Sequence, residues 1–219
     1  MTELNHAKRP VYVVDGCRSS FLKAKNKPGP FTASDLAVGA GKALLNRQNF
    51  DFGNIDEVIL GSVMPGADET NIARVCALRL GLPQHIPAWT VQRNCASGMQ
   101  ALDSAANNIA NGLSDLVLAG GVDAMSYAPL ILNLPMTEWF GAWSTQKTFL
   151  GKLKLLTKLR LSYFVPVISL IRGLTDHVVG LSMGQTAEIL AHRFHIEREQ
   201  MDEFAVQSHA RLGQAQDEG

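Results

Sequence analysis

The sequence predicts an α/β fold in which strands alternate with helices and pair into a largely parallel sheet. Short, continuous apolar runs bounded by turn residues recur along the first 130 residues and are typical of strands buried on both faces. Between these runs, apolar residues recur at steps of three and four, which is the spacing of a helix that packs one face on a sheet. Elements that alternate in this way favour parallel pairing through right-handed crossovers.

The individual elements follow from local signals. Thr32 or Ser34 is a suitable cap for a helix that ends within 46–52, and Gly81 with Pro83 ends a second helix over 71–80. Two further helices are predicted near the end of the chain, over 187–194 and 198–216. The predicted strands are residues 10–15, 55–60, 88–91, 115–119 and 122–127.

A cysteine stands at the sharpest of the predicted turns. Cys95 follows the strand 88–91 and precedes a helix whose apolar face includes Met99 and Leu102, with Asn94 as the expected N-cap. The unpaired N–H groups and the dipole of a helix N-terminus stabilise a thiolate over a thiol, which would make Cys95 a nucleophile. Gly98 removes a side chain where another group can approach closely. The alternative from spacing alone is a buried, unreactive cysteine.

Two motifs resemble the active-site region of the thiolases. They are Asn94-Cys95-Ala96-Ser97-Gly98-Met99-Gln100-Ala101 and Gly120-Gly121-Val122-Asp123-Ala124-Met125-Ser126. The resemblance implies that Cys95 accepts an acyl group from an acyl-CoA, and that the chain is the N-terminal half of a layered αβαβα body with a mainly helical loop subdomain. Asp123 is a departure, since many thiolases carry glutamate there.

Residues 129–195 differ in character from the chain before them. Residues 141–175 contain six basic residues and no acid, and leucines recur every three residues from Leu150 to Leu159. One interpretation is a subdomain that packs its leucines on the main body and leaves its lysines in water. The other is a docking surface for a partner subunit, a membrane or an anionic ligand such as CoA. Thiolases insert a CoA-covering loop domain here, and this version resembles the β-subunit type of the trifunctional enzyme. In that type the insertion meets a hydratase/dehydrogenase subunit or a membrane.

The resemblance also implies substrate-binding residues beyond the cysteine. Met183, in Leu181-Ser182-Met183-Gly184, matches the methionine that lines the acyl pocket, and Ser182 stands where some members carry histidine. Ser208 and His209 match a Ser-His pair of the family and are candidates for a nucleotide contact. From the residues alone, packing of Met183 and solvent exposure of Ser208 and His209 are equally compatible with the sequence.

Composition excludes several classes of function. The 219 residues carry a formal charge of zero, which argues against a nucleic-acid partner, and the three scattered cysteines fit free thiols in a reducing compartment. The polar residues 1–8 do not predict a signal peptide, so a cytoplasmic protein is expected. His192 and His195 lack further ligands at metal-binding spacing and predict a surface pair. No resident cofactor or metal is expected, because coenzyme A is a substrate of the family.

The domain prediction is an α/β domain over 1–128, a basic loop subdomain over 129–195, and the start of a returning helix over 196–219. The acid/base histidines and the second cysteine of thiolases belong to motifs of the C-terminal half, and this sequence contains none of them. The parent protein is therefore predicted to be a thiolase, commonly a dimer or dimer of dimers, and this chain alone is expected not to turn over. The alternatives are a ketoacyl synthase of the same superfamily and a non-catalytic partner-binding subunit.

Overall fold

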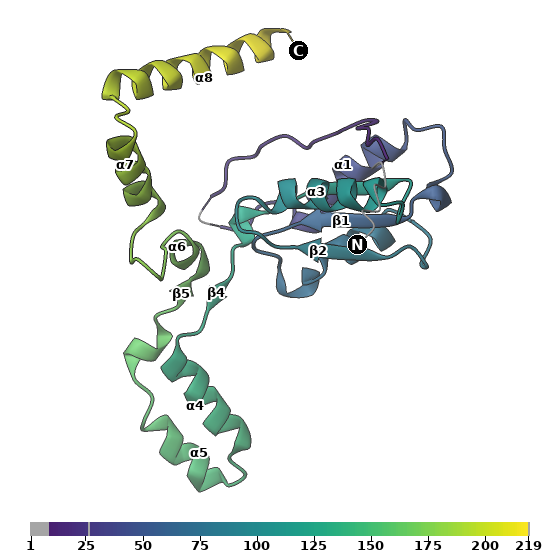
Figure 1. Cartoon of the computed structure of the whole chain (residues 1–219). Coiled ribbons are helices and arrows are strands. Elements are labelled where there is room, and N and C mark those ends of the chain that lie inside the picture. The colour runs from purple at the N-terminus through teal and green to yellow at the C-terminus, as the bar shows by residue number, and fades with distance from the viewer. Residues whose placement is uncertain (1–8, 26, 219) are drawn as a thin grey trace, which may run out of the picture. The chain divides into compact units, whose positions relative to one another are not determined.

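The computed structural model describes residues 9–25 and 27–218, and the chain divides into two units, Met1–Pro129 and Leu130–Gly219, each described here by itself (Figure 1). The first unit contains three helices, three strands and short 3₁₀ helices among its described residues. Its helices are α1 (Ala33–Leu45), α2 (Ile72–Arg79) and α3 (Ser97–Ala110), and its strands are β1 (Glu57–Gly61), β2 (Ala88–Val91) and β3 (Val117–Gly121).

The three strands of the first unit form one parallel sheet in the order β2-β1-β3, which confirms the predicted parallel pairing. Gly61, the last residue of β1, is opposite Val91 of β2 and Gly121 of β3. All three strands therefore end at the same level. Because they are parallel, the turns that follow them meet at one edge of the sheet, where a site can be assembled from several loops.

Helices cover both faces of this sheet. On one face Ile59 is fully buried with Ala101 and Ala105 of α3, and on the other Val58 and Leu60 pack in the cluster that holds α1 and α2. Side chains of a strand alternate between faces, so a continuous apolar run is what a strand between two helical layers requires. The sequence pattern of 57–61 is explained by this three-layer packing.

Side-chain caps fix where the helices on the second face begin. Thr32, one of the two predicted candidates, caps α1 in a capping box with Asp35, and Asn71 caps α2. Ser34 instead lies buried within the first turn of α1, where its hydroxyl contacts the carboxylate of Glu69 and accepts a hydrogen bond from Arg79. These contacts hold the N-terminus of α1 against the end of α2.

The prediction of a buried first strand over residues 10–15 is wrong. Val11 to Val14 have an extended, exposed backbone with no strand partner among the described residues, and Val13 is 91% exposed. An apolar run predicts a strand only if an adjacent strand edge and two covering layers are available. Here polar contacts at the two ends hold the segment, from Arg9 to Ala110 and Asp115 and from Asp15 to α1.

The predicted strand over 122–127 is also absent. The chain leaves β3 at Gly121, turns at Asp123 and forms a short 3₁₀ helix at Met125–Tyr127. The carboxylate of Asp123 accepts backbone hydrogen bonds from the loop after β1, and this competes with strand formation. The second predicted strand is shifted slightly, from 55–60 to Glu57–Gly61.

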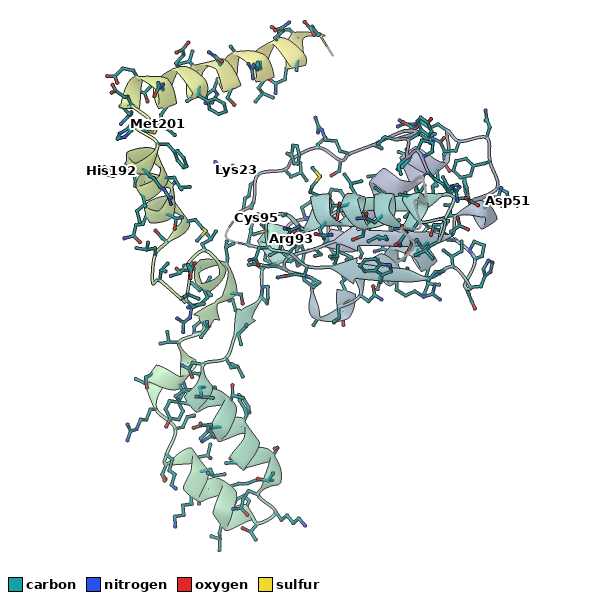
Figure 2. All side chains as sticks on the ribbon, viewed as in Figure 1. Lys23, Asp51, Arg93, Cys95, His192 and Met201 are labelled. Carbon is teal, nitrogen blue, oxygen red and sulfur yellow. The ribbon has the colours of Figure 1, made fainter. Side chains whose placement is uncertain are left out.

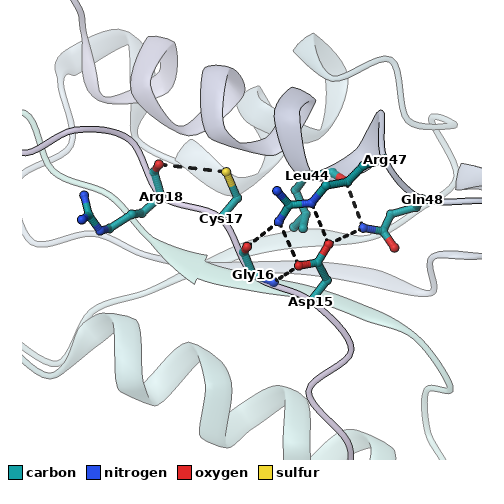
Figure 3. A network of polar contacts seen from close by, with 7 residues as sticks. All are labelled: Asp15, Gly16, Cys17, Arg18, Leu44, Arg47 and Gln48. Atoms are coloured by element: carbon teal, nitrogen blue, oxygen red, sulfur yellow. Dashed lines mark hydrogen bonds and ion pairs between the residues drawn. The ribbon is translucent and has the colours of Figure 1, made fainter. Parts of the chain in front are cut away.

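The contact between Asp15 and Arg47 predicts a pH effect on the N-terminal segment (Figure 3). Hydrogen bonds from the Arg47 guanidinium and then from the Gly16 N–H lower the pKa of Asp15 from 3.8 to about 2. Because the folded pKa is lowered, the contact stabilises the segment above pH 4 and this contribution is lost as the pH falls towards 2. The ¹³C carboxyl resonance of Asp15 should titrate near 2 in the wild type and near 3.8 in Arg47→Gln. An unchanged midpoint in the variant would show that the ion pair does not form.

The second unit is mainly helical. Its short strands β4 (Leu130–Ile131) and β5 (Val167–Ile168) pair antiparallel, and α4 (Leu134–Thr145) contacts α5 (Phe149–Leu156). A 3₁₀ helix (Leu161–Phe164) and α6 (Ser169–Gly173) flank β5, and α7 (Met183–Arg193) and α8 (Arg198–Glu218) follow. None of the helices within the described ranges is long and apolar enough to cross a bilayer.

The leucine spacing in α5 does not mark its packed face. Leu150, Leu153 and Leu156 are each about half exposed or more, whereas the indole N–H of Trp139 donates to the carbonyl of Leu155. Steps of three residues advance by 300° around a helix, so a run of such steps drifts across the helix surface instead of following one face. Trp139 and Trp143 of α4 stack on each other, and Lys152 lies over the Trp143 ring.

Candidate active site

Cys95 lies in the tight turn that joins β2 to α3, at the edge of the sheet where the strands end (Figure 2). It immediately precedes Ala96, the N-cap of α3, and its side chain is exposed and free. Its neighbour Arg93 extends from the same turn and donates a hydrogen bond to the side-chain oxygen of Gln100. The thiol is therefore accessible to a reactant and stands at the positive end of a 14-residue helix.

The backbone of this turn differs from the expected N-cap arrangement. Asn94 is not the N-cap: it adopts a left-handed backbone with φ of 47°, and the N-cap Ala96 makes no side-chain cap bond. The hydroxyl of Ser97 replaces the cap by donating to the carbonyl of Asn94 at 2.6 Å and accepting from the N–H of Arg93 at 2.8 Å. Asparagine tolerates the left-handed region better than most residues, so its presence before Cys95 permits the sharp turn.

Two glycines allow this turn to rest directly on the sheet. A β-carbon on Gly61 would lie 2.6 Å from the nitrogen of Gly98 and closer still to the carbonyl of Ser97. A β-carbon on Gly121 would lie 3.0 Å from the Cα of Gly98. The predicted close approach at Gly98 is thus real, but the two strand ends restrict side-chain size more, because a β-carbon on Gly98 would stand at an ordinary 3.8 Å.

The three cysteines differ in their surroundings. Cys17 and Cys95 are exposed, whereas Cys76 is buried in α2, and burial raises the pKa of the Cys76 thiol to about 11. In native alkylation at pH 8 we expect Cys17 and Cys95 to react and Cys76 to react about a hundredfold more slowly. Peptide mass spectrometry of time points, with an unfolded sample as reference, measures the three rates. Comparable labelling of Cys76 in the native sample would contradict this burial.

The four predicted substrate residues all lie in the second unit. Ser182 is the N-cap of α7 and forms a capping box with Gln185, a structural role that the Ser182-x-x-Gln185 spacing signals. Met183 begins α7, donates its N–H to the carbonyl of Leu174 and is half exposed. Ser208 and His209 are exposed on α8. Cys95 belongs to the first unit, so these residues are not described as one site.

A hollow of about 450 Å³ in the first unit does not contain the cysteine of the site. It lies between the extended segment at residues 17–24, α1 and the turn after β3, and Cys17, Phe21 and Asp123 are among its lining residues. Cys95 does not line it. The chemistry that the structure supports lies instead at the exposed turn.

The turn supplies a nucleophile and hydrogen-bond donors but no proton acceptor. Within residues 9–25 and 27–218, no side chain hydrogen-bonds to the Cys95 sulfur, and the N–H groups of Gly98 and Met99 at the start of α3 have no acceptor. Such free N–H groups stabilise negative charge that develops nearby. The arrangement suits attack by a thiolate on a carbonyl carbon, with proton transfer supplied by groups from elsewhere.

A family model described as "Thiolase, N-terminal domain" matches residues 11–219. The β-subunit of the mitochondrial trifunctional enzyme of Bos taurus is 35% identical over 211 residues, which is 96% of this chain and 44% of that protein. A 3-ketoacyl-CoA thiolase of Pseudoalteromonas translucida is 32% identical over 223 residues, which is all of this chain and 50% of that protein. The chain thus spans about half the length of the curated relatives it matches.

Solved structures agree with these sequence matches. The crystal structure of the Bacillus anthracis acetyl-CoA acetyltransferase superposes with a TM-score of 0.70 at 34% identity, covering 87% of this chain and 43% of that chain. The human mitochondrial 3-ketoacyl-CoA thiolase in complex with CoA superposes with a TM-score of 0.68 at 33% identity, covering 87% of this chain and 44% of that chain. The fold is therefore the one predicted from the sequence.

Proposed function

Because the chain belongs to the thiolase family through its N-terminal domain, we propose that Cys95 is the nucleophile that carries the acyl group in transfer between a 3-ketoacyl-CoA and CoA. The observation that carries this proposal is the position of Cys95: an exposed thiol in the turn between β2 and the N-terminus of α3. A thiolate is stabilised there by the helix terminus, and an incoming thioester reaches it from solvent.

The proposed reaction is an acyl transfer in two steps. In the cleaving direction, the Cys95 thiolate attacks the ketone carbon of a 3-ketoacyl-CoA, and the bond between that carbon and the acetyl-CoA carbon breaks. The acetyl-CoA carbanion takes up a proton and leaves, and the acyl group stays on Cys95 as a thioester. The CoA thiol, after losing its proton, then attacks this thioester and releases the shortened acyl-CoA. The condensing direction is the reverse of these steps.

The chain's own contribution is the nucleophile and the N–H groups beside it. Both proton transfers need an acid/base group, and the turn provides none among the described residues. We therefore propose that this chain by itself becomes acylated at Cys95 but does not turn over. CoA and acyl-CoA are the proposed ligands, which fits the CoA complex of the human 3-ketoacyl-CoA thiolase.

The experiment is mass spectrometry of the intact chain and its peptides after incubation with acetyl-CoA or acetoacetyl-CoA. We expect an acetyl adduct on the Cys95 peptide that hydroxylamine removes, and none in Cys95→Ala. Cys17→Ala, which removes the other exposed thiol, is the matched control and should keep the adduct. An adduct on Cys17 alone, or none on a chain whose Cys95 alkylates readily, would contradict acyl loading at Cys95. Steady CoA-dependent thiolysis would contradict the lack of turnover.

For residues 141–175 we propose an interaction surface for a partner subunit or a membrane. This segment has six basic residues and no acid, and Phe149, Leu150 and Leu161 are largely exposed on the second unit. Co-sedimentation with anionic vesicles, compared with neutral vesicles and with a Lys152→Glu/Lys154→Glu variant, tests the membrane form. Binding that depends on anionic lipid and falls in the variant supports a membrane, whereas no binding to either vesicle leaves the partner subunit as the proposal.

A further inference from the structure

The carboxylate of Asp123 joins the loop after β3 to the loop after β1. One oxygen, Oδ1, accepts hydrogen bonds from the Ser62 hydroxyl at 3.1 Å and from the N–H groups of Val63 and Met64 at 2.9 Å each. The N–H of Val122 donates to the carbonyl of Gly61 at 2.9 Å. These four bonds fix the carboxyl ends of the two strands relative to each other, just beyond the last residues of the sheet.

The same strand ends support the cysteine turn. Gly61 and Gly121 lie directly beneath Ser97 and Gly98, with backbone against backbone and no side chain between them. A displacement of either strand end is therefore transmitted to the first turn of α3 without being absorbed by a flexible side chain. Ser97 in turn holds both Arg93 and Asn94, the residues that lead into Cys95.

We propose that Asp123 is a positioning residue for Cys95, acting through the ends of β1 and β3 on which the cysteine turn rests. The inference rests on the proposed nucleophilic role of Cys95. Asp123 does not touch the reacting atoms: it holds the Ser62–Met64 loop and the exit of β3 together, so that Gly61 and Gly121 keep the N–H groups of α3 beside the thiol. Since one oxygen accepts all three bonds from the loop, a neutral amide oxygen in the same place can replace it.

The test compares Asp123→Ala with Asp123→Asn in the full chain. Amide hydrogen exchange reports on the turn through a peptide over 92–100 and on the rest of the first unit through a peptide over 33–45. We expect Asp123→Ala to speed exchange of the turn peptide about tenfold with little change in 33–45, and Asp123→Asn to stay within about twofold of the wild type. The second readout is the rate and pH profile of Cys95 alkylation by iodoacetamide. It should fall about fivefold at pH 7 in Asp123→Ala and recover in Asp123→Asn.

Two glycine variants keep the test decisive if Asp123→Ala does not fold. Gly121→Ala places a methyl group 3.0 Å from the Cα of Gly98 and should loosen the turn peptide selectively. Gly120→Ala, its neighbour on the same strand, meets only the Leu60 side chain at 3.7 Å and should behave as the wild type. Equal loosening of both peptides in the aspartate and glycine variants, or an unchanged Cys95 rate in a folded Asp123→Ala, would overturn the proposal.

The alkylation readout separates this inference from the proposed function. Iodoacetamide needs no CoA site, so a wild-type chain that alkylates at Cys95 but takes no acyl group would refute acyl loading without affecting the role of Asp123. Conversely, acyl loading that is unchanged in a folded Asp123→Ala, together with unchanged alkylation, would refute the positioning role and leave the nucleophile in place.

Discussion

Replacing Gly61 with alanine is expected to destabilise the first unit by about 3 kcal/mol, at the upper end of the cost of overpacking. The added β-carbon would overlap the backbone of Ser97 and Gly98, which belongs to a helix start and cannot rotate away as a side chain can. Either α3 must lift from the sheet or β1 must shift against its two neighbouring strands. Both movements also displace the turn that carries Cys95.

Urea unfolding followed by circular dichroism measures this loss, with Gly120→Ala as the matched control. At Gly120 an added methyl group reaches Leu60 at an ordinary 3.7 Å, and alanine restricts the unfolded chain more than glycine does. We therefore expect Gly120→Ala to be neutral or slightly stabilising. If Gly61→Ala unfolds at the wild-type urea concentration, α3 does not rest on the strand ends as described.

The cysteine turn could be predicted from the sequence because its signals are local. A β-prone run, a cysteine and a helical stripe within 20 residues predict a strand, a turn and a helix, and the structure has all three. The cap was assigned wrongly because Asn94 and Ser97 are both good capping residues. The left-handed φ of Asn94 and the hydroxyl bond of Ser97 to the carbonyl of Asn94 decided between them.

Long-range pairing could not be predicted in the same way. Val11 to Val14 have the composition of a buried strand, yet a strand also needs a free edge beside it and layers above and below it. Those requirements are met by other segments of the chain, and the apolar run does not specify them. Similarly, the close approach of Gly61 and Gly121 to α3 joins residues 60 apart, and only the structure reveals it.

Replacing Glu57 with alanine is the second large effect, with an expected loss of about 3 kcal/mol, because it leaves buried hydrogen-bond donors without their acceptor. Glu57 is buried at the start of β1 and its carboxylate serves three elements. Oε1 accepts from Asn108 of α3 and from Ser114 before β3, and Oε2 accepts from the indole N–H of Trp89 in β2. No single replacement side chain provides all three acceptor positions.

Glutamine at position 57 separates the contributions of the two oxygens. Its amide oxygen can keep Asn108 and Ser114, but its NH₂ group then faces the N–H of Trp89, so two donors oppose each other. We expect Glu57→Gln to cost about half as much as Glu57→Ala. Combining it with Trp89→Phe removes the opposed donor, so the double variant should be more stable than the sum of the single effects predicts. Strict additivity in urea unfolding would mean that the Trp89 N–H is satisfied by water, and that Glu57 stabilises the sheet through α3 alone.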